Sequence, residues 1–454
     1  MFQTVQLPLW LLVLILAFAI VTALSHFLLP SVRWFFRRRM ERVVARLNER
    51  LERPIEPFKL ARRHDMIQRL SYDAKVMEAV GERAQEAEIP EDVAFQEAQG
   101  YAREIVPSFS ASAYFGFAIK FARWISQGFY RVRLGYFDEG AIAKIGPNST
   151  VVFIMNHRSN MDYVLVTYLA AERSALSYAV GEWARVWPLS RLIKAMGAYF
   201  IRRRSRNDLY RRVLARYVQM ATAGGVAQAV FPEGGLSLNG KVGEPKLGLL
   251  NYIVSDFDPE KGRDVAFVPV ALNYDRVFED RVLVAASEAG VRKFRFHWSS
   301  AVRYVFKHLY QRLTGGFLRF GYAAVSFGEP LSLAEFSKGK KGDVTKDIGR
   351  ELMRRIRKIV PVLPLPLVCY CLLNSDGPFT RDALVDLACE KRKLLLANGA
   401  HVRPKGGVPE EEINVALNHL LMRKLIVETQ TGISINSKER VLLEYYANTI
   451  AHLF

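Results

Sequence analysis

Short apolar runs rich in β-branched residues alternate with helical stretches between residues 146 and 335, and this alternation leaves few possible architectures. Such a pattern is typical of an α/β domain in which helices cover a central sheet of buried strands. The expected strands are Ser149–Met155, Val226–Phe231, Val265–Leu272 and Arg319–Phe327, and the expected helices between them include Tyr163–Arg173 and Leu209–Thr222.

The regions on either side of this α/β pattern are mainly helical. Ala111–Tyr130 is strongly apolar but contains Lys120 and Arg123, which fits either a buried helix or a helix lying on a surface. An apolar run at 358–373 is interrupted by three prolines and is better suited to a core or an interface than to a membrane span. We therefore expect an N-terminal transmembrane anchor (1–32), a helical membrane-proximal region (33–145), an α/β catalytic domain (146–357) and a small, mainly helical C-terminal domain (358–454).

The N-terminus indicates membrane attachment. Met1–Val32 contains no Asp, Glu, Lys or Arg, and Leu7–Leu29 would be about 34 Å long as a helix, enough to cross the hydrocarbon core of a bilayer. Arginines follow from Arg33 onward, so the positive-inside rule predicts a single pass through the inner membrane with the catalytic domain in the cytoplasm. A cleaved signal peptide and a helix lying flat in the interface are the alternatives.

The charge balance favours anionic partners. Lys and Arg number 64 against 45 Asp and Glu, a formal charge of +19, which suits phospholipid headgroups, phosphorylated substrates or nucleic acid. No aromatic–basic recognition motif supports nucleic acid, so we expect an anionic phospholipid membrane instead. The three cysteines form no Cys-x-x-Cys pair, and the sequence suggests neither a metal site nor a cofactor.

The first candidate site is Asn156–Asp162, which directly follows an expected strand. His157 and Asp162 can meet across a strand–turn–helix junction, where a carboxylate fixes the imidazole tautomer and raises its basicity, as a general base requires. A structural histidine, with Asp162 as a helix-start charge, would produce the same spacing.

Two further blocks place charged residues at the ends of extended segments. In Gly197–Arg204, either Arg202 or Arg203 would face a cleft and bind phosphate, unless the block is only a solvated basic turn. In Val230–Ser237, the two glycines would let a ligand approach the backbone beside Glu233, although a Gly-Gly pair after a strand is often just a turn. The later Val268-Pro269-Val270 would form an apolar wall.

In this order, H-x-x-x-x-D, G-x-x-F-I-R-R, F-P-E-G-G and V-P-V resemble the glycerolipid acyltransferase family, and most of all its membrane-bound bacterial glycerol-3-phosphate 1-O-acyltransferases. The resemblance covers roughly residue 55 to the end of the chain. The third block departs from the family pattern, because Leu236 and Leu238 stand where arginines are usual. The matching segments are His157–Tyr163, Gly197–Arg203, Glu233–Gly235, Pro245–Gly248 and Leu443–Phe454.

The resemblance implies transfer of a fatty acyl group from acyl-CoA or acyl carrier protein to the sn-1 hydroxyl of glycerol 3-phosphate. It implies His157 as the general base, with Asp162 orienting it, and no metal or cofactor. Lysophosphatidic acid as the acceptor and a non-catalytic membrane scaffold are the alternatives. The implied substrate-binding residues are Arg158, Ser159, Asn160, Arg202, Arg203, Glu233, Gly234, Gly235, Ser237, Lys241 and Lys246.

Overall fold

The computed structural model describes most of the chain in two compact units. The N-terminal unit ends at Ile55 and the main unit begins at Glu56. Within the first helix, the side chains of residues 23–37 and 40 are not described. The described residues are 8–169, 175–181, 189–202, 207–260, 262–290, 319–340, 342–404, 406 and 408–454.

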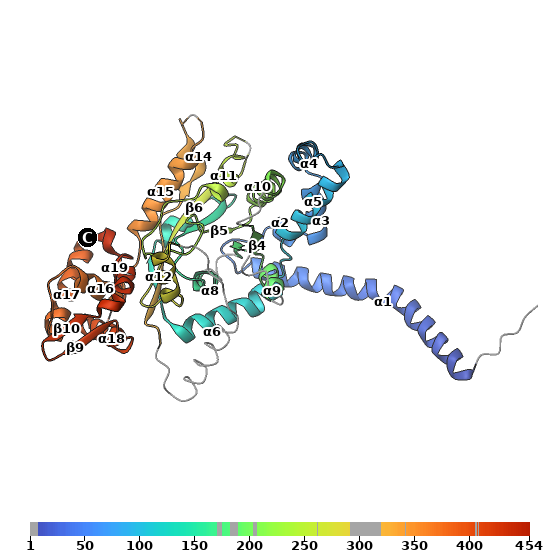
Figure 1. Ribbon diagram of the computed structural model, residues 1–454. Coiled ribbons are helices and arrows are strands. Elements are labelled where there is room, and N and C mark those ends of the chain that lie inside the picture. Colours follow the sequence, from blue (N-terminus) through green and yellow to red (C-terminus); the bar gives the residue numbers. More distant parts are fainter. Residues whose placement is uncertain are drawn as a thin grey trace, which may run out of the picture. The chain divides into compact units, whose positions relative to one another are not determined.

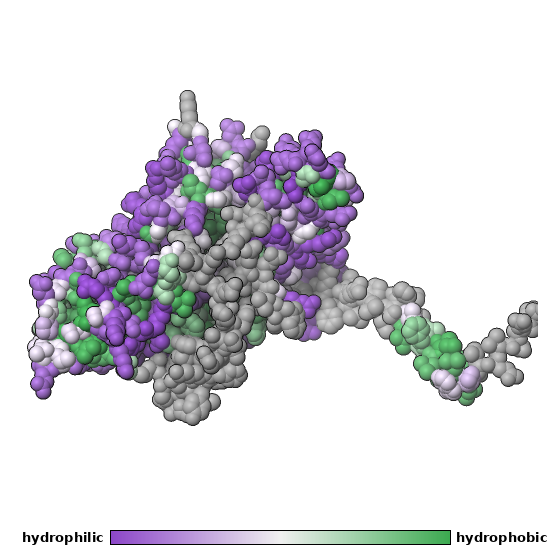
Figure 2. Space-filling view, in the orientation of Figure 1, coloured by the Kyte–Doolittle hydropathy of each residue, from purple (hydrophilic) through white to green (hydrophobic). Residues whose placement is uncertain are grey.

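The N-terminal unit consists of one long helix, α1 (Leu9–Asn48), which Pro8 precedes. Its first half exposes apolar side chains from Leu9 to Val21, visible as the green stretch of the N-terminal helix in Figure 2. Among the helices that the structure describes, none combines the length and the apolar character needed to cross a bilayer. Part of the expected anchor, residues 1–7 and the side chains of 23–32, lies outside the described residues.

A mixed sheet forms the centre of the main unit (Figure 1). The strand order is β1-β7-β6-β2-β5-β3-β4, and β8 pairs with β6. All pairings are parallel except those of β6 with β7 and with β8. The strands are β1 Arg131–Phe137, β2 Thr150–Met155, β3 Ser177–Gly181, β4 Tyr199–Ile201, β5 Gln228–Val230, β6 Val265–Tyr274, β7 Tyr322–Phe327 and β8 Leu331–Ser332.

Strand β2 lies inside the sheet and is buried on both faces, as its continuous apolar sequence predicts. Because successive side chains of a strand point to opposite faces, Phe153 joins one apolar cluster and Val152 the other. Helices α3, α4, α5, α10, α11 and α15 pack in the cluster of Val152, whereas α8, α12 and the C-terminal helices pack in that of Phe153. The residue that follows β2 therefore lies between these two apolar clusters.

Helices surround this sheet in the main unit. They are α2 Pro57–Leu60, α3 Arg63–Ser71, α4 Ala74–Glu86, α5 Glu91–Ile105, η1 Ser112–Ala118, α6 Ile119–Phe129, α7 Glu139–Ala143, α8 Met161–Leu169, α9 Leu189–Ala195, α10 Asp208–Ala223, α11 Gly248–Val254, α12 Asp280–Glu288, α14 Leu333–Ser337 and α15 Thr345–Lys358.

The C-terminal region is mainly helical, as expected, with one small hairpin (Figure 1). The proline-interrupted apolar run becomes α16, whose side chains are almost all buried, so the core interpretation of that run is correct. Its elements are α16 Pro364–Leu373, α17 Arg381–Ala397, α18 Pro409–Met422, β9 Ile426–Thr429, β10 Gly432–Ile435, η3 Ser437–Glu439, α19 Arg440–Ala447 and η4 Ala451–Leu453.

The expected α/β architecture is confirmed, but the sheet contains more strands than the sequence pattern predicts. Strand β1 falls in the stretch expected to be helical, because its alternating sequence Arg-Val-Arg-Leu is half exposed at a sheet edge and lacks a continuous apolar run. Strand β3 was also not expected. The four strands expected from the sequence appear as β2, β5, β6 and β7 with slightly different bounds.

Candidate functional site

The candidate site begins where β2 ends. Asn156 fastens this point to the neighbouring strand β6, since its Nδ2 donates to the Leu272 carbonyl (3.0 Å) and its Oδ1 accepts from the Leu272 N–H (2.8 Å). Helix α8 then starts at Met161, whose N–H donates to Ser159 Oγ (3.1 Å). The turn between strand and helix therefore has a defined shape, which brings His157 and Asp162 together.

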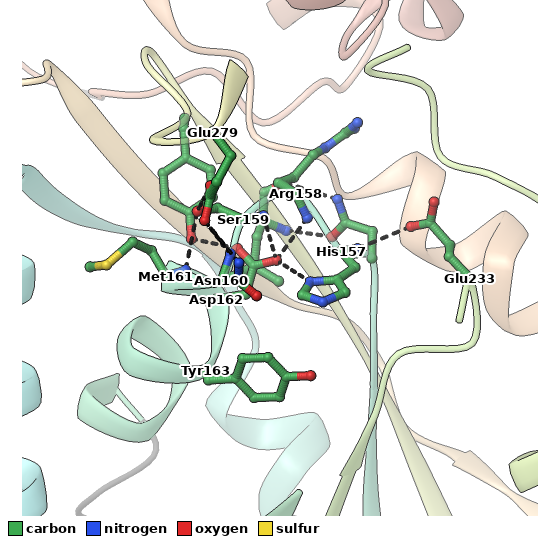
Figure 3. A network of polar contacts seen from close by, with 12 residues as sticks. His157, Arg158, Ser159, Asn160, Met161, Asp162, Tyr163, Glu233 and Glu279 are labelled. Atoms are coloured by element: carbon green, nitrogen blue, oxygen red, sulfur yellow. Dashed lines mark hydrogen bonds and ion pairs between the residues drawn. The ribbon is translucent and has the colours of Figure 1, made fainter. Parts of the chain in front are cut away.

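His157 and Asp162 form a buried pair (Figure 3). His157 Nδ1 lies 2.9 Å from Asp162 Oδ2. The imidazole also stacks on the Phe231 ring, with centroids 4.1 Å apart. With Nδ1 donating its proton to the carboxylate, the lone pair of the ring falls on Nε2, which is the arrangement of a general base.

Asp162 has more partners than His157 alone. Its Oδ2 also accepts from the backbone N–H groups of Arg158 (2.7 Å) and Ser159 (3.1 Å), while its Oδ1 accepts from the Tyr274 hydroxyl at 2.6 Å. Four donors thus surround a side chain with no exposed surface. Such a set of donors fixes the orientation of the carboxylate toward the imidazole.

Glu233 connects the third sequence block to the first. Its Oε1 accepts from the His157 N–H (3.0 Å), and its Oε2 accepts from the Gly243 N–H (3.0 Å). Burial raises the pKa of this carboxyl, while the Arg158 charge and these two N–H groups lower it. Glu233 therefore links the backbone at His157 to the backbone at Gly243.

The rest of the third block lies beside the histidine. The Ser237 N–H donates to the His157 carbonyl (2.9 Å), and the Ser237 hydroxyl donates to the Lys241 carbonyl (2.7 Å). Gly234 has a positive φ of 65°, and a Cβ there would meet the Lys246 side chain, so glycine is needed for both conformation and space. Leu236 and Leu238 pack against the apolar cluster that contains Phe231.

Arg158 is the largest of the fully buried side chains and is directed toward the C-terminal region. One of its amino groups donates to the Gly240 carbonyl, whereas Nε and the other amino group have no partner within the described structure. Gly240 also contacts the backbone of Tyr445 so closely that a side chain at this glycine would clash with it. The C-terminal helix α19 therefore supports the loop that follows the third block.

Two family profiles match the chain. Residues 139–273 match the family described as acyltransferase, and residues 312–454 match the glycerol-3-phosphate acyltransferase C-terminal region. The chain is therefore similar to the acyltransferase family in one region and to glycerol-3-phosphate acyltransferases in another. The resemblance drawn from the sequence motifs is thereby confirmed.

Relatives of this acyltransferase family support the assignment over most of the chain. Proteins named glycerol-3-phosphate acyltransferase from Pseudomonas syringae pv. syringae and Pseudomonas entomophila are 25% and 26% identical over 430 residues, which is 87% of this chain. The chain spans about half the length of these curated relatives (49%). The solved 1-acyl-sn-glycerophosphate acyltransferase of Thermotoga maritima is 18% identical, with a TM-score of 0.33 over 57% of this chain and 81% of that one.

The sequence motifs missed two residues of the site. Glu279, just before α12, accepts from the Ser159 hydroxyl (2.7 Å) and from the backbone and side-chain N–H groups of Asn160 (3.2 and 3.1 Å). Burial raises the pKa of Glu279. Tyr274 was also missed, although it ends β6, the parallel neighbour of β2, where polar residues at the carboxyl end commonly belong to a site.

The acyltransferase block around Arg202 differs from the expectation of a free phosphate ligand. The guanidinium of Arg202 makes hydrogen bonds of 2.7–3.1 Å to both carboxylate oxygens of Glu104 in α5. It also lies over the rings of Tyr101 and Tyr210. In this structure Arg202 therefore joins the end of β4 to helix α5, and its role toward a phosphate stays a prediction. Arg203 lies outside the described residues.

Proposed function

We propose that the protein transfers a fatty acyl group from an acyl thioester to the sn-1 hydroxyl of glycerol 3-phosphate. The observation that supports this most is the contact of 2.9 Å between His157 Nδ1 and the fully buried, four-fold hydrogen-bonded Asp162. A structural histidine does not require a carboxylate prepared in this way. A hydroxyl acceptor does, because its proton must be removed as it attacks the thioester carbonyl.

In the proposed reaction, His157 Nε2 accepts the hydroxyl proton while the acceptor oxygen bonds to the thioester carbon. The imidazolium that forms is stabilised by Asp162, which remains ionised. The tetrahedral intermediate then expels the thiolate of coenzyme A or of the acyl carrier protein, and this thiolate takes the proton from Nε2. The products are lysophosphatidic acid and the free thiol, so no atom or charge is left over.

We assign the acceptor phosphate to the cations around the third and second blocks. Lys246 lies over Gly234, and Lys241 follows Ser237 in the same loop, so both are close to the backbone of the site. Gly234 and Gly235 would let the phosphate approach the main chain. Arg203 completes the proposed set. Arg202 would join it only by leaving Glu104.

A second acceptor is favoured by one feature of the loop. Leu236 and Leu238 pack against the apolar cluster, so this part of the loop is apolar where the family usually has arginines. An apolar wall suits an acceptor that already carries an acyl chain, such as lysophosphatidic acid. The same His157–Asp162 pair would serve that acceptor.

We also propose that the exposed apolar residues of Leu9–Val21 attach the protein to a bilayer of anionic phospholipid, with the main unit on the cytoplasmic face of the inner membrane. The proposed product, a lysophospholipid, would then be released directly into the bilayer.

The deciding experiment measures transfer from palmitoyl-CoA to labelled glycerol 3-phosphate and, separately, to lysophosphatidic acid. We expect labelled lysophosphatidic acid from the first acceptor and its loss in His157→Ala. His64→Ala is the matched control, because His64 is an exposed histidine of α3. Full activity of His157→Ala would refute the mechanism, and turnover of lysophosphatidic acid alone would establish the second acceptor.

A further inference from the structure

The continuous helical segment formed by η1 and α6 carries large aromatic side chains on its exposed face, unlike an ordinary surface helix. Apart from Tyr114, its buried positions hold small residues, Ala118, Ala122 and Ser126. Three of its large aromatic side chains point to solvent: Phe117, Phe121 and Trp124 are 52%, 42% and 56% exposed. A soluble helix gains stability by burying aromatic rings, so this arrangement indicates that the outer face is covered by something else.

The three exposed rings form one continuous surface, which we call the aromatic face. Phe117 stacks on Phe121 with centroids 5.5 Å apart, and Phe121 stacks on Trp124 at 6.1 Å. Scattered apolar residues are normal on a protein surface, whereas contiguous apolar patches mark interaction sites. Tryptophan and phenylalanine are also side chains that favour the boundary between lipid headgroups and acyl chains.

Along the segment that carries the aromatic face, the charged residues have a single sign. No Asp or Glu occurs from Ile105 to Phe137, whereas Lys120 and Arg123 are exposed beside the rings, and Arg131 and Arg133 are exposed on β1. Arg123 lies over the Tyr168 ring at 5.3 Å. A stretch that is cationic and free of acids repels a second copy of itself and attracts an anionic surface.

We propose that the aromatic face docks on the surface of a bilayer containing anionic phospholipid, with the three rings inserted among the headgroups and Lys120 and Arg123 on lipid phosphates. This surface belongs to the main unit and is separate from α1. The proposal does not depend on the proposed acyl transfer.

Docking in this way would give the candidate site a fixed orientation to the lipid. Helix α6 packs against α8, and the Gln127 side chain donates to the Tyr168 hydroxyl at 3.0 Å. Asp162 lies in the first turn of α8. The helix that carries the histidine's partner is thus directly supported by the proposed membrane-docking helix, so His157 and Asp162 would keep a constant orientation relative to the bilayer.

The test attaches a nitroxide label to the full chain at Phe121→Cys, in a Cys389→Ser background because Cys369 and Cys371 are buried. Vesicles contain phosphatidylcholine with 30% phosphatidylglycerol. We expect the label to become accessible to oxygen and protected from a water-soluble nickel reagent when vesicles are added. A label at Val282→Cys, another exposed apolar position, on α12, is the control and stays in water.

This readout separates the aromatic face from α1, since attachment through α1 alone would leave the label at position 121 in water. That result, or failure of the chain to bind these vesicles at all, would overturn the proposal. A second variant, Lys120→Glu with Arg123→Glu, leaves the rings and the fold intact. It is expected to weaken vesicle binding by about tenfold at low salt and by less at high salt. Unchanged binding at both salt concentrations would equally contradict the role of the cations.

Discussion

The turn after β2 and the end of β4 both carry motifs with charged residues, yet the two regions are built differently. After β2, the polar groups converge on one carboxylate, Asp162, which accepts from a histidine, a tyrosine and two backbone N–H groups. At the end of β4, Arg202 pairs with one carboxylate, Glu104, which belongs to a covering helix. The first arrangement prepares a base, and the second connects two elements.

This difference shows that the ion-pair partner of a charged residue cannot be identified from the motif that contains it. Arg202 and Glu104 are far apart in the sequence, so nothing in the block at Gly197–Arg204 reveals the ion pair. His157 and Asp162 are close in sequence, and the strand–turn–helix junction alone is enough to join them. Local contacts are therefore more predictable than those between distant elements.

The largest effect is expected from Asp162→Asn. An amide has only one oxygen to accept from four donors, and its NH₂ group would face other N–H groups and favour the wrong histidine tautomer. The rate of acyl transfer at saturating substrate should fall by at least about 10³-fold. The measurement is single-turnover transfer from palmitoyl-CoA, with circular dichroism to show that the fold persists. A loss below tenfold would mean that Asp162 has only a structural role.

A smaller loss of rate is expected from Glu279→Gln, since Glu279 holds Ser159 and Asn160 from the far side of the turn. Replacing one acceptor oxygen with an NH₂ group breaks part of this support, worth roughly 1–2 kcal/mol, or about tenfold in rate. The rate should fall while the acceptor KM changes little. Glu288→Gln is the control, because Glu288 is exposed at the end of α12. This change should leave both the rate and the acceptor KM unchanged.

The variant Arg202→Ala tests whether this arginine connects β4 to α5 or binds the acceptor phosphate. We expect mainly a stability effect, because the change removes the ion pair of Arg202 with the nearly buried Glu104. The Tm should be lower by a few degrees and the acceptor KM should stay within about twofold. The double variant Arg202→Ala with Glu104→Gln should recover part of the Tm. A large rise in KM at unchanged Tm would instead establish Arg202 as a phosphate ligand.

The smallest effect concerns another buried carboxylate, Asp275, which within the described part of the chain accepts from the N–H groups of Tyr322 and Leu365. Burial raises its pKa to about 7 from an ordinary 3.8. The folded state therefore holds a proton that the unfolded chain releases, so this stabilisation is complete below about pH 4 and is lost as the pH rises through 7. The free energy of unfolding, measured with urea, should fall from pH 5.5 to pH 7.5. This slope with pH should be shallower in Asp275→Asn than in the unchanged protein. Equal slopes would contradict the raised pKa.

Several features of the fold and the site followed from local patterns. The buried run at β2 predicted an interior strand, and the residues after it predicted the contact between His157 and Asp162. The blocks also predicted the family correctly. Strand β1 escaped prediction because an edge strand with alternating charges resembles a loop or a helix end. Glu279 escaped because it reaches the site from a distant segment.

By itself, the sequence determined the α/β class, the family and the pair that forms the proposed base, since each depends on contacts between residues close along the chain or on motifs held in order. Tertiary structure alone decided that Arg202 pairs with Glu104, that Glu279 and Tyr274 complete the site, and that the aromatic face of α6 points outward. These features depend on which distant elements the sheet and its two cores bring together. Long-range packing is not encoded in any short stretch of residues, because it arises only when the whole apolar surface is buried at once.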